Sequence, residues 1–247
     1  MTGSRLLAID VGNTQITLGL FEGGTLVRQG SIPTQESHTT DGLWGEGLAG
    51  SDRVSIASVV PEKTQILADL IEAQHGIHPL IITADVIRSL RIQYDPPSSV
   101  GADRLCGAVA AFKKFGGPVV VVDVGTATVF DVISAEAVYL GGLIAPGVRT
   151  AIDSLHRKAA LLPLVEAVFP PSLIGGDTVS AIQSGVLNGT VEMVNGIIAR
   201  IEQQAGSRVK VVATGGFAGL LRPHCNRMEF LEPDLVLEGI RLITEEQ

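Results

Sequence analysis

The sequence LLAIDVGNT at residues 6–14 is an apolar run that ends in an aspartate and a glycine-containing turn. Apolar residues then alternate over 16–21, as in a second, half-buried strand. Half a chain later the same order returns as VVVVDVGTAT at residues 119–128, again followed by alternating apolar positions. Each segment is expected to form a β-hairpin whose first strand ends at an aspartate, Asp10 or Asp123. Two such hairpins indicate duplicated halves that face each other across a cleft.

The rest of the chain alternates between strand-like and helix-like segments. Apolar runs predict further strands at 53–60, 79–83 and 209–213. Helical spacing of apolar residues predicts helices at 62–75, 102–114, 151–160, 180–204 and 235–246. The clearest linker is Gly116-Gly117-Pro118, so we expect an N-terminal half over 1–116 and a C-terminal half over 117–247.

Composition narrows the class of protein. Hydrophobic residues make up 45% of the chain but aromatic residues only 4%, so the core must be aliphatic, as in sheets covered by helices. The net charge of −8 and the scattered Lys and Arg residues argue against nucleic acid as the partner. The apolar run at 119–133 contains two aspartates, which argues against a membrane span.

Cysteine and histidine usage points to no metal or disulfide site. The two cysteines, Cys106 and Cys225, lie far apart in the sequence, so a reducing cytoplasm fits best and both are expected to be buried free thiols. The five histidines form no convincing metal-ligand pattern. Trp44 is expected to serve in packing, with a weak interface role as the alternative.

Three turns carry the residues expected for phosphate binding, at 10–14, 125–127 and 214–216. Each follows an apolar strand and contains glycine, which lets backbone N–H groups approach a phosphate closely. An aspartate at a strand end can hold Mg²⁺ through water. A single Asp-Gly turn is more often ordinary hairpin chemistry, and only the repetition favours function. The P-loop and Rossmann signatures are both absent.

These turns resemble the phosphate and adenosine motifs of the actin-like ATPase superfamily, and narrower features resemble type III pantothenate kinase. The narrower features are DVGNT (10–14), SVVP (58–61), YDP (94–96), GADR (101–104), DVGTAT (123–128), GGLIAPG (141–147), and DT (177–178) before QSG (183–185). The most specific of them is GADR, placed between the two Asp-Val-Gly turns. The resemblance extends from residue 6 to about 216.

The resemblance implies a fold and a reaction. The expected fold is α/β, with two ribonuclease-H-like (actin-like) halves, each a mixed sheet flanked by helices, and a nucleotide cleft between them. The implied reaction is ATP-dependent phosphorylation of pantothenate to 4′-phosphopantothenate, the first step of coenzyme A biosynthesis. A cytoplasmic homodimer, with the substrate pocket near the dimer interface, is also implied.

The resemblance also implies roles for individual residues. Asp103 matches the catalytic base, Asp123 the ligand of a monovalent cation (K⁺ or NH₄⁺), and Asp10 can hold Mg²⁺ through water. The residues that match pantothenate-binding positions are Tyr94, Gly101, Ala102, Asp103, Arg104 and Thr178. Those that match ATP contacts are Asp10, Val11, Gly12, Asn13, Thr14, Gln15, Ile16, Thr17 and Thr126.

The sequence leaves the roles of some residues, and two alternative functions, undecided. Arg104 could face the substrate carboxylate or the transferred phosphoryl group, and Asp103-Arg104 could instead be helix-start chemistry. The chain departs from the family pattern at Gln15, Val129 and Ala159, where another small polar or hydroxyl residue is common. Two alternative functions remain. One is a catalytically silent relative that binds or regulates, and the other is a kinase of the same superfamily for another hydroxylated acid or sugar.

Overall fold

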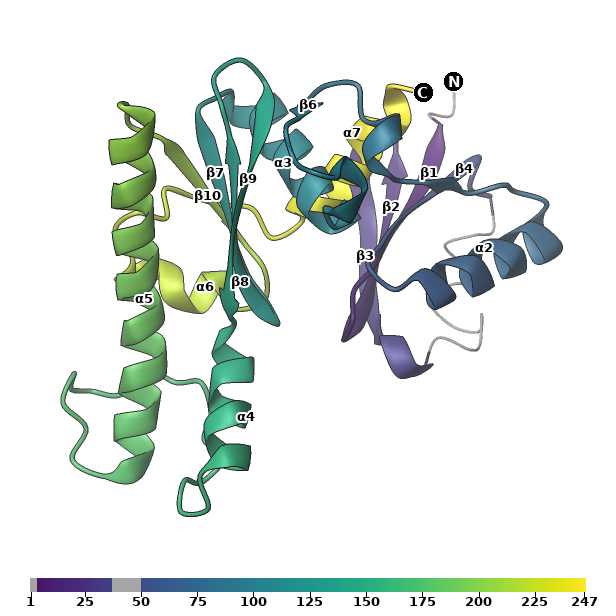
Figure 1. Cartoon of the computed structure of the whole chain (residues 1–247). Coiled ribbons are helices and arrows are strands. Elements are labelled where there is room, and N and C mark those ends of the chain that lie inside the picture. The colour runs from purple at the N-terminus through teal and green to yellow at the C-terminus, as the bar shows by residue number, and fades with distance from the viewer. Residues whose placement is uncertain (1–3, 37–49) are drawn as a thin grey trace. The chain divides into compact units, whose positions relative to one another are not determined.

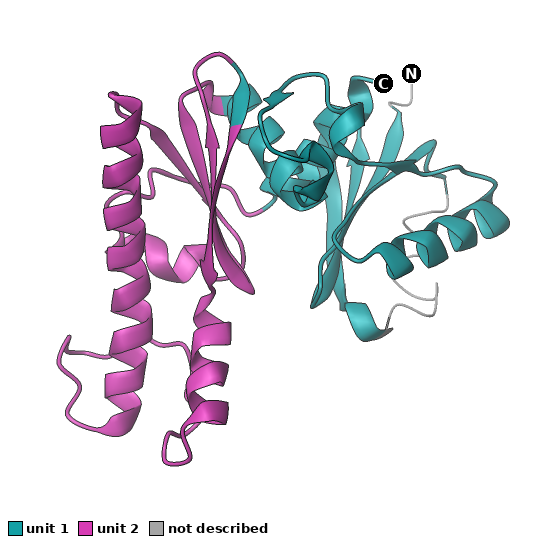
Figure 2. Cartoon of the chain, viewed as in Figure 1, with its two compact units in different colours: residues 1–114, 137–139, 234–247 teal, residues 115–136, 140–233 magenta. Residues whose placement is uncertain are grey.

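The computed structural model describes residues 4–36 and 50–247, and Trp44 and His38 lie outside them (Figure 1). The chain forms two compact units (Figure 2). The first contains residues 1–114, 137–139 and 234–247, and the second contains residues 115–136 and 140–233. The expected division into domains after residue 116 stays a prediction.

The first unit contains a mixed sheet with the strand order β3-β2-β1-β4-β5. Its strands are β1 (Arg5–Val11), β2 (Gln15–Glu22), β3 (Thr25–Pro33), β4 (Arg53–Ser58) and β5 (Leu80–Ile81). The first three strands are antiparallel, whereas β4 runs parallel to both β1 and β5. The hairpin expected from residues 6–21 is therefore confirmed, with Asp10 opposite Thr17 near its end.

Helices cover both faces of this sheet, which explains why β1 is apolar at consecutive positions. On one face, Leu67 and Ile71 of α2 (Pro61–His75) pack against Leu7 and Ile9. On the other, α7 (Leu235–Glu245) contacts β1, β2 and β4. Helix α3 (Ala102–Phe115) packs closely on α7. Gly239 of α7 lies so near the backbone of Cys106 in α3 that any side chain at 239 would overlap with it.

The second unit is built on strands in the order β11-β10-β7-β8-β9. These are β7 (Val119–Val124), β8 (Ala127–Ile133), β9 (Val138–Pro146), β10 (Lys210–Thr214) and β11 (Phe230–Leu231). Strands β7 and β8 form the second expected hairpin, and β10 runs parallel to both β7 and β11. Strand β6 (Arg91–Ile92) pairs in parallel with Val138 and Tyr139 at the start of β9, and these four residues belong to the first unit.

Helices α4 (Val148–Lys158), α5 (Thr178–Ala205) and α6 (Ala218–Leu221) belong to the second unit. Figure 1 shows α5 alongside the sheet, and its buried residues Leu187, Val191 and Val194 share a core with the strand β7. Short 3₁₀ turns complete the fold: η1 (Thr34–Glu36), η2 (Ala84–Val86), η3 (Pro97–Ser99) and η4 (Arg222–His224).

The two sheets repeat one topology. Strands β1 to β5 take the order 3-2-1-4-5, and β7 to β11 take the same order in their own sheet. In both, the strand that carries the aspartate is central, with a hairpin partner on one side and a parallel strand on the other. The duplicated mixed α/β fold expected from the sequence is therefore confirmed. Within residues 4–36 and 50–247, none of the helices combines the length and the apolar character that crossing a bilayer requires.

Candidate active site

The first turn connects β1 to β2 and is held tightly by backbone contacts. The Gly12 N–H donates to the Gln15 carbonyl at 3.0 Å. The Thr34 hydroxyl donates to the Gly12 carbonyl at 2.7 Å, and the Thr34 N–H donates to the Thr14 carbonyl at 3.0 Å. One face of the turn is thus fixed by Thr34, while the side chains of Asn13, Thr14 and Gln15 are exposed.

Two of the residues expected at the nucleotide have side chains in the core. Val11 and Ile16 are both 0% exposed and pack in the cluster beneath the sheet. Only their backbone groups could reach a ligand. Asp10 is partly buried, and one of its carboxylate oxygens, Oδ1, is shielded from solvent.

Asp103 lies in the first turn of α3, close to the end of β1. Burial raises the pKa of its carboxyl group, and this is opposed by the N–H of Arg104, which donates to Oδ1 at 2.8 Å, and by the Arg104 charge. One turn further along α3, burial raises the pKa of the Cys106 thiol, with added contributions from the charges of Asp10 and Asp103. Both carboxylates therefore lie near one thiol, which brings the first turn and residues 101–104 together.

Val59, the residue after β4, contacts both the first turn and residues 101–104. The Val59 N–H donates to the Val11 carbonyl at 3.1 Å, which extends the β1–β4 pairing by one residue. A Cβ at Gly101 would lie 3.2 Å from Cγ1 of Val59 and would overlap with Oδ1 of Asp103. Glycine at 101 thus leaves the space that the Asp103 carboxylate occupies.

The other residues expected at the substrate differ in their surroundings. The ring of Tyr94 is 36% exposed and stands 6.3 Å from the buried ring of Tyr139. Ala102 is buried at 6% exposure, so it serves in packing, whereas Arg104 is half-buried. Thr178 belongs to the second unit, whereas the other five belong to the first.

The second and third turns lie against each other in the second unit. Thr214, at the end of β10, is paired with Asp123 in β7, and the Phe217 N–H donates to the Val124 carbonyl at 3.0 Å. Gly215 has a φ of +87°, and a Cβ there would overlap with Oδ1 of Asp123. The Asp123 carboxylate therefore lies beside the glycines of both turns, because a Cβ at Gly125 would be 3.5 Å from the same oxygen.

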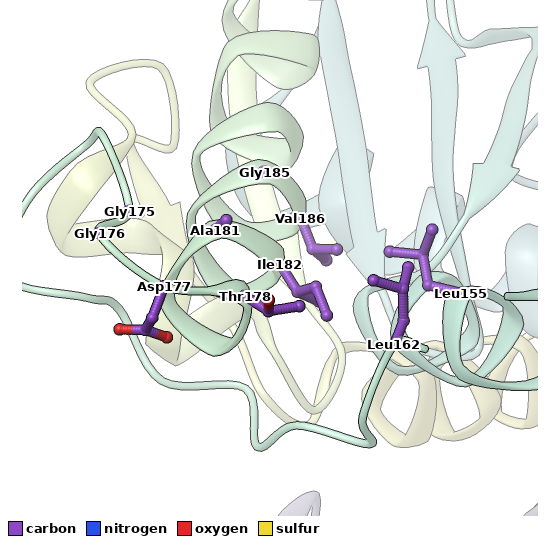
Figure 3. Close-up of a pocket in the computed structure, with 10 residues that line it drawn as sticks. All are labelled: Leu155, Leu162, Gly175, Gly176, Asp177, Thr178, Ala181, Ile182, Gly185 and Val186. Atoms are coloured by element: carbon purple, nitrogen blue, oxygen red, sulfur yellow. The ribbon is translucent and has the colours of Figure 1, made fainter. Parts of the chain in front are cut away.

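Thr178 is the first residue of α5 and lines an open hollow of about 710 Å³ (Figure 3). Asp177 caps the helix by accepting the Ser180 N–H at 2.9 Å, and the Ser180 hydroxyl accepts the Asp177 N–H at 3.2 Å. This partnership with Ser180 lowers the pKa of Asp177. Apolar side chains and glycines form the rest of the lining: Leu155, Leu162, Gly175, Gly176, Ala181, Ile182, Gly185 and Val186.

The motifs DT and QSG marked Asp177, Thr178 and Gly185 of this lining, but not the apolar side chains around them. Leu155 comes from the end of α4, and Leu162 comes from the segment after it, where the sequence keeps a Leu-Pro pair that resembles the family pattern. Ala181 and Gly185, four positions apart on α5, were an available signal, because small residues at that spacing keep one helix face open. Across the described part of the chain, no three His, Cys, Asp or Glu side chains are grouped as metal ligands.

Solved structures with similar folds come from several proteins. A candidate Baf family transcriptional activator from Campylobacter jejuni matches with a TM-score of 0.64 at 19% identity, over 97% of this chain and 98% of that one. The ethanolamine utilization protein EutJ from Carboxydothermus hydrogenoformans gives 0.54 at 16% identity, over 98% and 91%. A candidate N-acetylmannosamine kinase from Listeria monocytogenes gives 0.50 at 13% identity, over 98% and 99%. These similarities and the repeated strand order define an actin-like α/β fold.

Sequence comparisons narrow this class to one family. The model of the family described as type III pantothenate kinase matches residues 6–200. Type III pantothenate kinases from Moorella thermoacetica and Geobacter sulfurreducens are 45% and 38% identical to this chain, and each match covers 97% of this chain and 98% of the relative. The chain belongs to the type III pantothenate kinase family.

Proposed function

We propose that this enzyme transfers the γ-phosphoryl group of ATP to the 4′-hydroxyl of pantothenate, with Asp103 as the general base. The product is 4′-phosphopantothenate, which places the reaction at the start of coenzyme A biosynthesis. The observation that carries the proposal is the partly buried Asp103 carboxylate, with its raised pKa, near the Asp10 turn in a chain of this family. A raised pKa makes a carboxylate a better proton acceptor near neutral pH.

Asp103 would accept the proton as the hydroxyl attacks the phosphorus. The backbone N–H of Arg104 donates to Oδ1 of Asp103 at 2.8 Å, which helps to hold the proposed base in place. Phosphoryl transfer depends mainly on alignment and on neutralisation of charge. The Arg104 side chain would supply positive charge to either the substrate carboxylate or the phosphoryl group.

The proposed ATP contacts are divided between backbone and side chains. Buried Val11 and Ile16 would contribute only backbone groups, whereas exposed Asn13, Thr14 and Gln15 can contribute side chains. Gly12 allows close approach of the backbone, and Asp10, Thr17 and Thr126 complete the set. Phosphate oxygens bind well to clustered N–H donors of this kind.

The proposed cations fit the available donors. Asp10 and Asp123 offer oxygen atoms, which Mg²⁺ and K⁺ both prefer, and each carboxylate lies at a strand end beside a glycine turn. Single aspartates cannot complete either coordination shell, so water, backbone carbonyls and phosphate oxygens must supply the rest. Mg²⁺ held through water at Asp10 would neutralise phosphate charge, and K⁺ or NH₄⁺ at Asp123 would do so near Thr126.

The pantothenate-binding set proposed from the family resemblance consists of Tyr94, residues 101–104 and Thr178. Each of these residues is proposed to contact the substrate. Because Ala102 is buried, its proposed contact is through the backbone. The exposed Thr178 hydroxyl, at the start of a 28-residue helix, suits an anionic group such as a carboxylate.

We also propose that the enzyme is a homodimer in the cytoplasm, where its substrates are available. Leu161, Leu173 and Ile174 are 93%, 71% and 85% exposed, and all three lie in the segment between α4 and α5. Exposed aliphatic side chains gathered in one segment are typical of an interface. A second copy of the chain that covers them would also approach Thr178.

The experiment that tests the reaction is identification of the product. Purified enzyme is incubated with ATP, Mg²⁺ and pantothenate, with and without K⁺, and the products are identified by mass spectrometry and ³¹P NMR. Formation of 4′-phosphopantothenate that depends on K⁺ supports the proposal. ATP binding without any phosphorylated product would favour a silent relative. Turnover of another hydroxylated acid in a substrate panel, with pantothenate inert, would replace the substrate.

A further inference from the structure

The carbonyl group of Thr126 is held by two donors from the start of α4. The Gly147 N–H donates to it at 3.1 Å, and the Thr150 hydroxyl donates to it at 2.6 Å. Thr150 lies in the first turn of α4 and is half-buried. The motif GGLIAPG noted in the sequence ends at Gly147, and Thr150 belongs to none of the motifs noted there.

Gly147 is needed for space. Its φ of −76° is open to any residue, but a Cβ there would overlap with the carbonyl groups of Gly125 and Thr126. The start of α4 therefore lies directly against the second turn. Any larger residue at 147 would push the helix, and with it Thr150, away from the Thr126 carbonyl.

The Thr150 hydroxyl fixes the orientation of one peptide group. In a trans peptide the carbonyl and the following N–H point in opposite directions. Because Thr150 and Gly147 hold the Thr126 carbonyl toward α4, the N–H of Ala127 is directed away from that helix. The Gly125 N–H closes the turn by donating to the Ala127 carbonyl at 2.9 Å. Three hydrogen bonds thus define the shape of the turn.

We propose that Thr150 is a positioning residue for ATP: its hydroxyl holds the Thr126–Ala127 peptide in the orientation that receives the nucleotide phosphates. The inference rests on the proposed role of Thr126 in ATP binding. Thr150 acts through the turn and need not touch the nucleotide. Its loss should therefore weaken ATP binding and leave the pantothenate residues of the first unit unaffected.

The test compares Thr150→Val, which keeps the shape of the side chain, with Thr150→Ser, which keeps the hydroxyl. Thr190→Val is the matched control, because the Thr190 hydroxyl donates to Val186 within α5, outside the turn. The readouts are KM for each substrate, the Kd of a non-hydrolysable ATP analogue by calorimetry, and the melting temperature.

Thr150→Val should raise KM for ATP and the analogue Kd by about three- to tenfold, the usual effect of one lost hydrogen bond. KM for pantothenate should not change, and Thr150→Ser and Thr190→Val should keep wild-type ATP affinity. If Thr150→Val unfolds, Thr150→Ala removes the same hydroxyl with less bulk and should give the same shift.

Unchanged ATP affinity in a folded Thr150→Val protein would overturn the inference. So would equal losses for both substrates that Thr150→Ser does not restore, because that pattern indicates a purely structural role. Thr126→Ala distinguishes a failure of the role proposed for Thr150 from a failure of the role proposed for Thr126. If it weakens ATP binding while Thr150→Val does not, only the role of Thr150 fails. If neither has an effect, the proposed contact of the Thr126 side chain with ATP also fails.

Discussion

Asp103 combines two conflicting demands on one side chain. Burial penalises its charged form and raises its pKa, while the Arg104 N–H and charge favour ionisation. A general base needs a carboxylate that is ionised yet still accepts a proton readily. The fold therefore tolerates a partly desolvated charge at the position where the proposed mechanism requires it.

This conflict predicts a stability effect. A carboxyl group whose pKa is raised by folding destabilises the folded state most at pH values above that pKa, and the penalty shrinks as the pH falls from there to the lower pKa of the unfolded state. Asp103→Asn, which can still accept the Arg104 N–H, should therefore melt at a higher temperature than wild type at neutral pH. Thermal unfolding at several pH values should show the difference shrinking toward acid pH. An unchanged or lower melting temperature at neutral pH would contradict the role given to burial.

Gly101 predicts a second effect at the same scale. A methyl group in Gly101→Ala would meet Val59 and force the Asp103 carboxylate to move. Displacement of a catalytic group by about 1 Å can cost roughly 100-fold in rate, so we expect kcat to fall about ten- to 100-fold. Gly219→Ala is the control, because nothing lies within 4 Å of a Cβ there. A Gly101→Ala enzyme with wild-type kcat would show that this clearance is unimportant.

At the scale of elements, the start of α5 places Thr178 next to a capping box. The lowered pKa of Asp177 means that folding favours its ionised form, so the cap stabilises the helix at neutral pH and is lost as the pH falls through that lowered pKa. Asp177→Ala should lower the melting temperature and raise KM for pantothenate, while Asp177→Asn should retain most of both properties. Thermal unfolding and steady-state kinetics test this. A raised KM for ATP alone would contradict the placement of Thr178 at pantothenate.

The elements predicted from the sequence were those with an uninterrupted pattern. Strands β1 and β7 were readable because sheets covered on both faces require consecutive apolar residues. Helix α5 begins at Thr178, two residues before the predicted start, because Asp177 supplies its cap. Helix α4 begins at Val148, three residues before the predicted start, because Gly147 lies against the second turn. Such contacts between distant segments leave no local signal.

The site was predictable to the same extent. The position of Asp103 near Asp10 could be expected only from the family resemblance, since the two are far apart in the sequence and meet through β4 and α3. The contact of Thr150 with the second turn, and the leucines around Thr178, depend on how α4 returns to the sheet. The spacing of apolar residues does not predict where α4 packs against the sheet.

At the scale of the whole molecule, the repeated strand order places one aspartate at the end of the central strand in each sheet. The duplicated fold thus contains two similar turns, but different segments contact each of them. Thr34 holds the first turn, whereas α4 and the Gly215 turn hold the second. Our proposal places Mg²⁺ at Asp10 and K⁺ at Asp123, so the two turns would bind different cations.

The proposed homodimer gives a further prediction at this scale. Ile174→Asp places a charge at an aliphatic position that is 85% exposed. If a second copy covers this position, the variant should elute as a monomer in size-exclusion chromatography with light scattering, and KM for pantothenate should rise. Leu140→Asp, at a position 49% exposed outside the segment between α4 and α5, is the control. A wild-type monomer would contradict the dimer.

The central claim is that Asp103 is the base of a pantothenate kinase, and the most direct test is turnover by Asp103→Asn. ADP release is measured with ATP, Mg²⁺, K⁺ and pantothenate, alongside calorimetry of the ATP analogue. We predict that kcat falls by about 100- to 10,000-fold, while the analogue binds within about twofold of wild type. An Asp103→Asn enzyme that keeps more than about a tenth of wild-type kcat would contradict the claim.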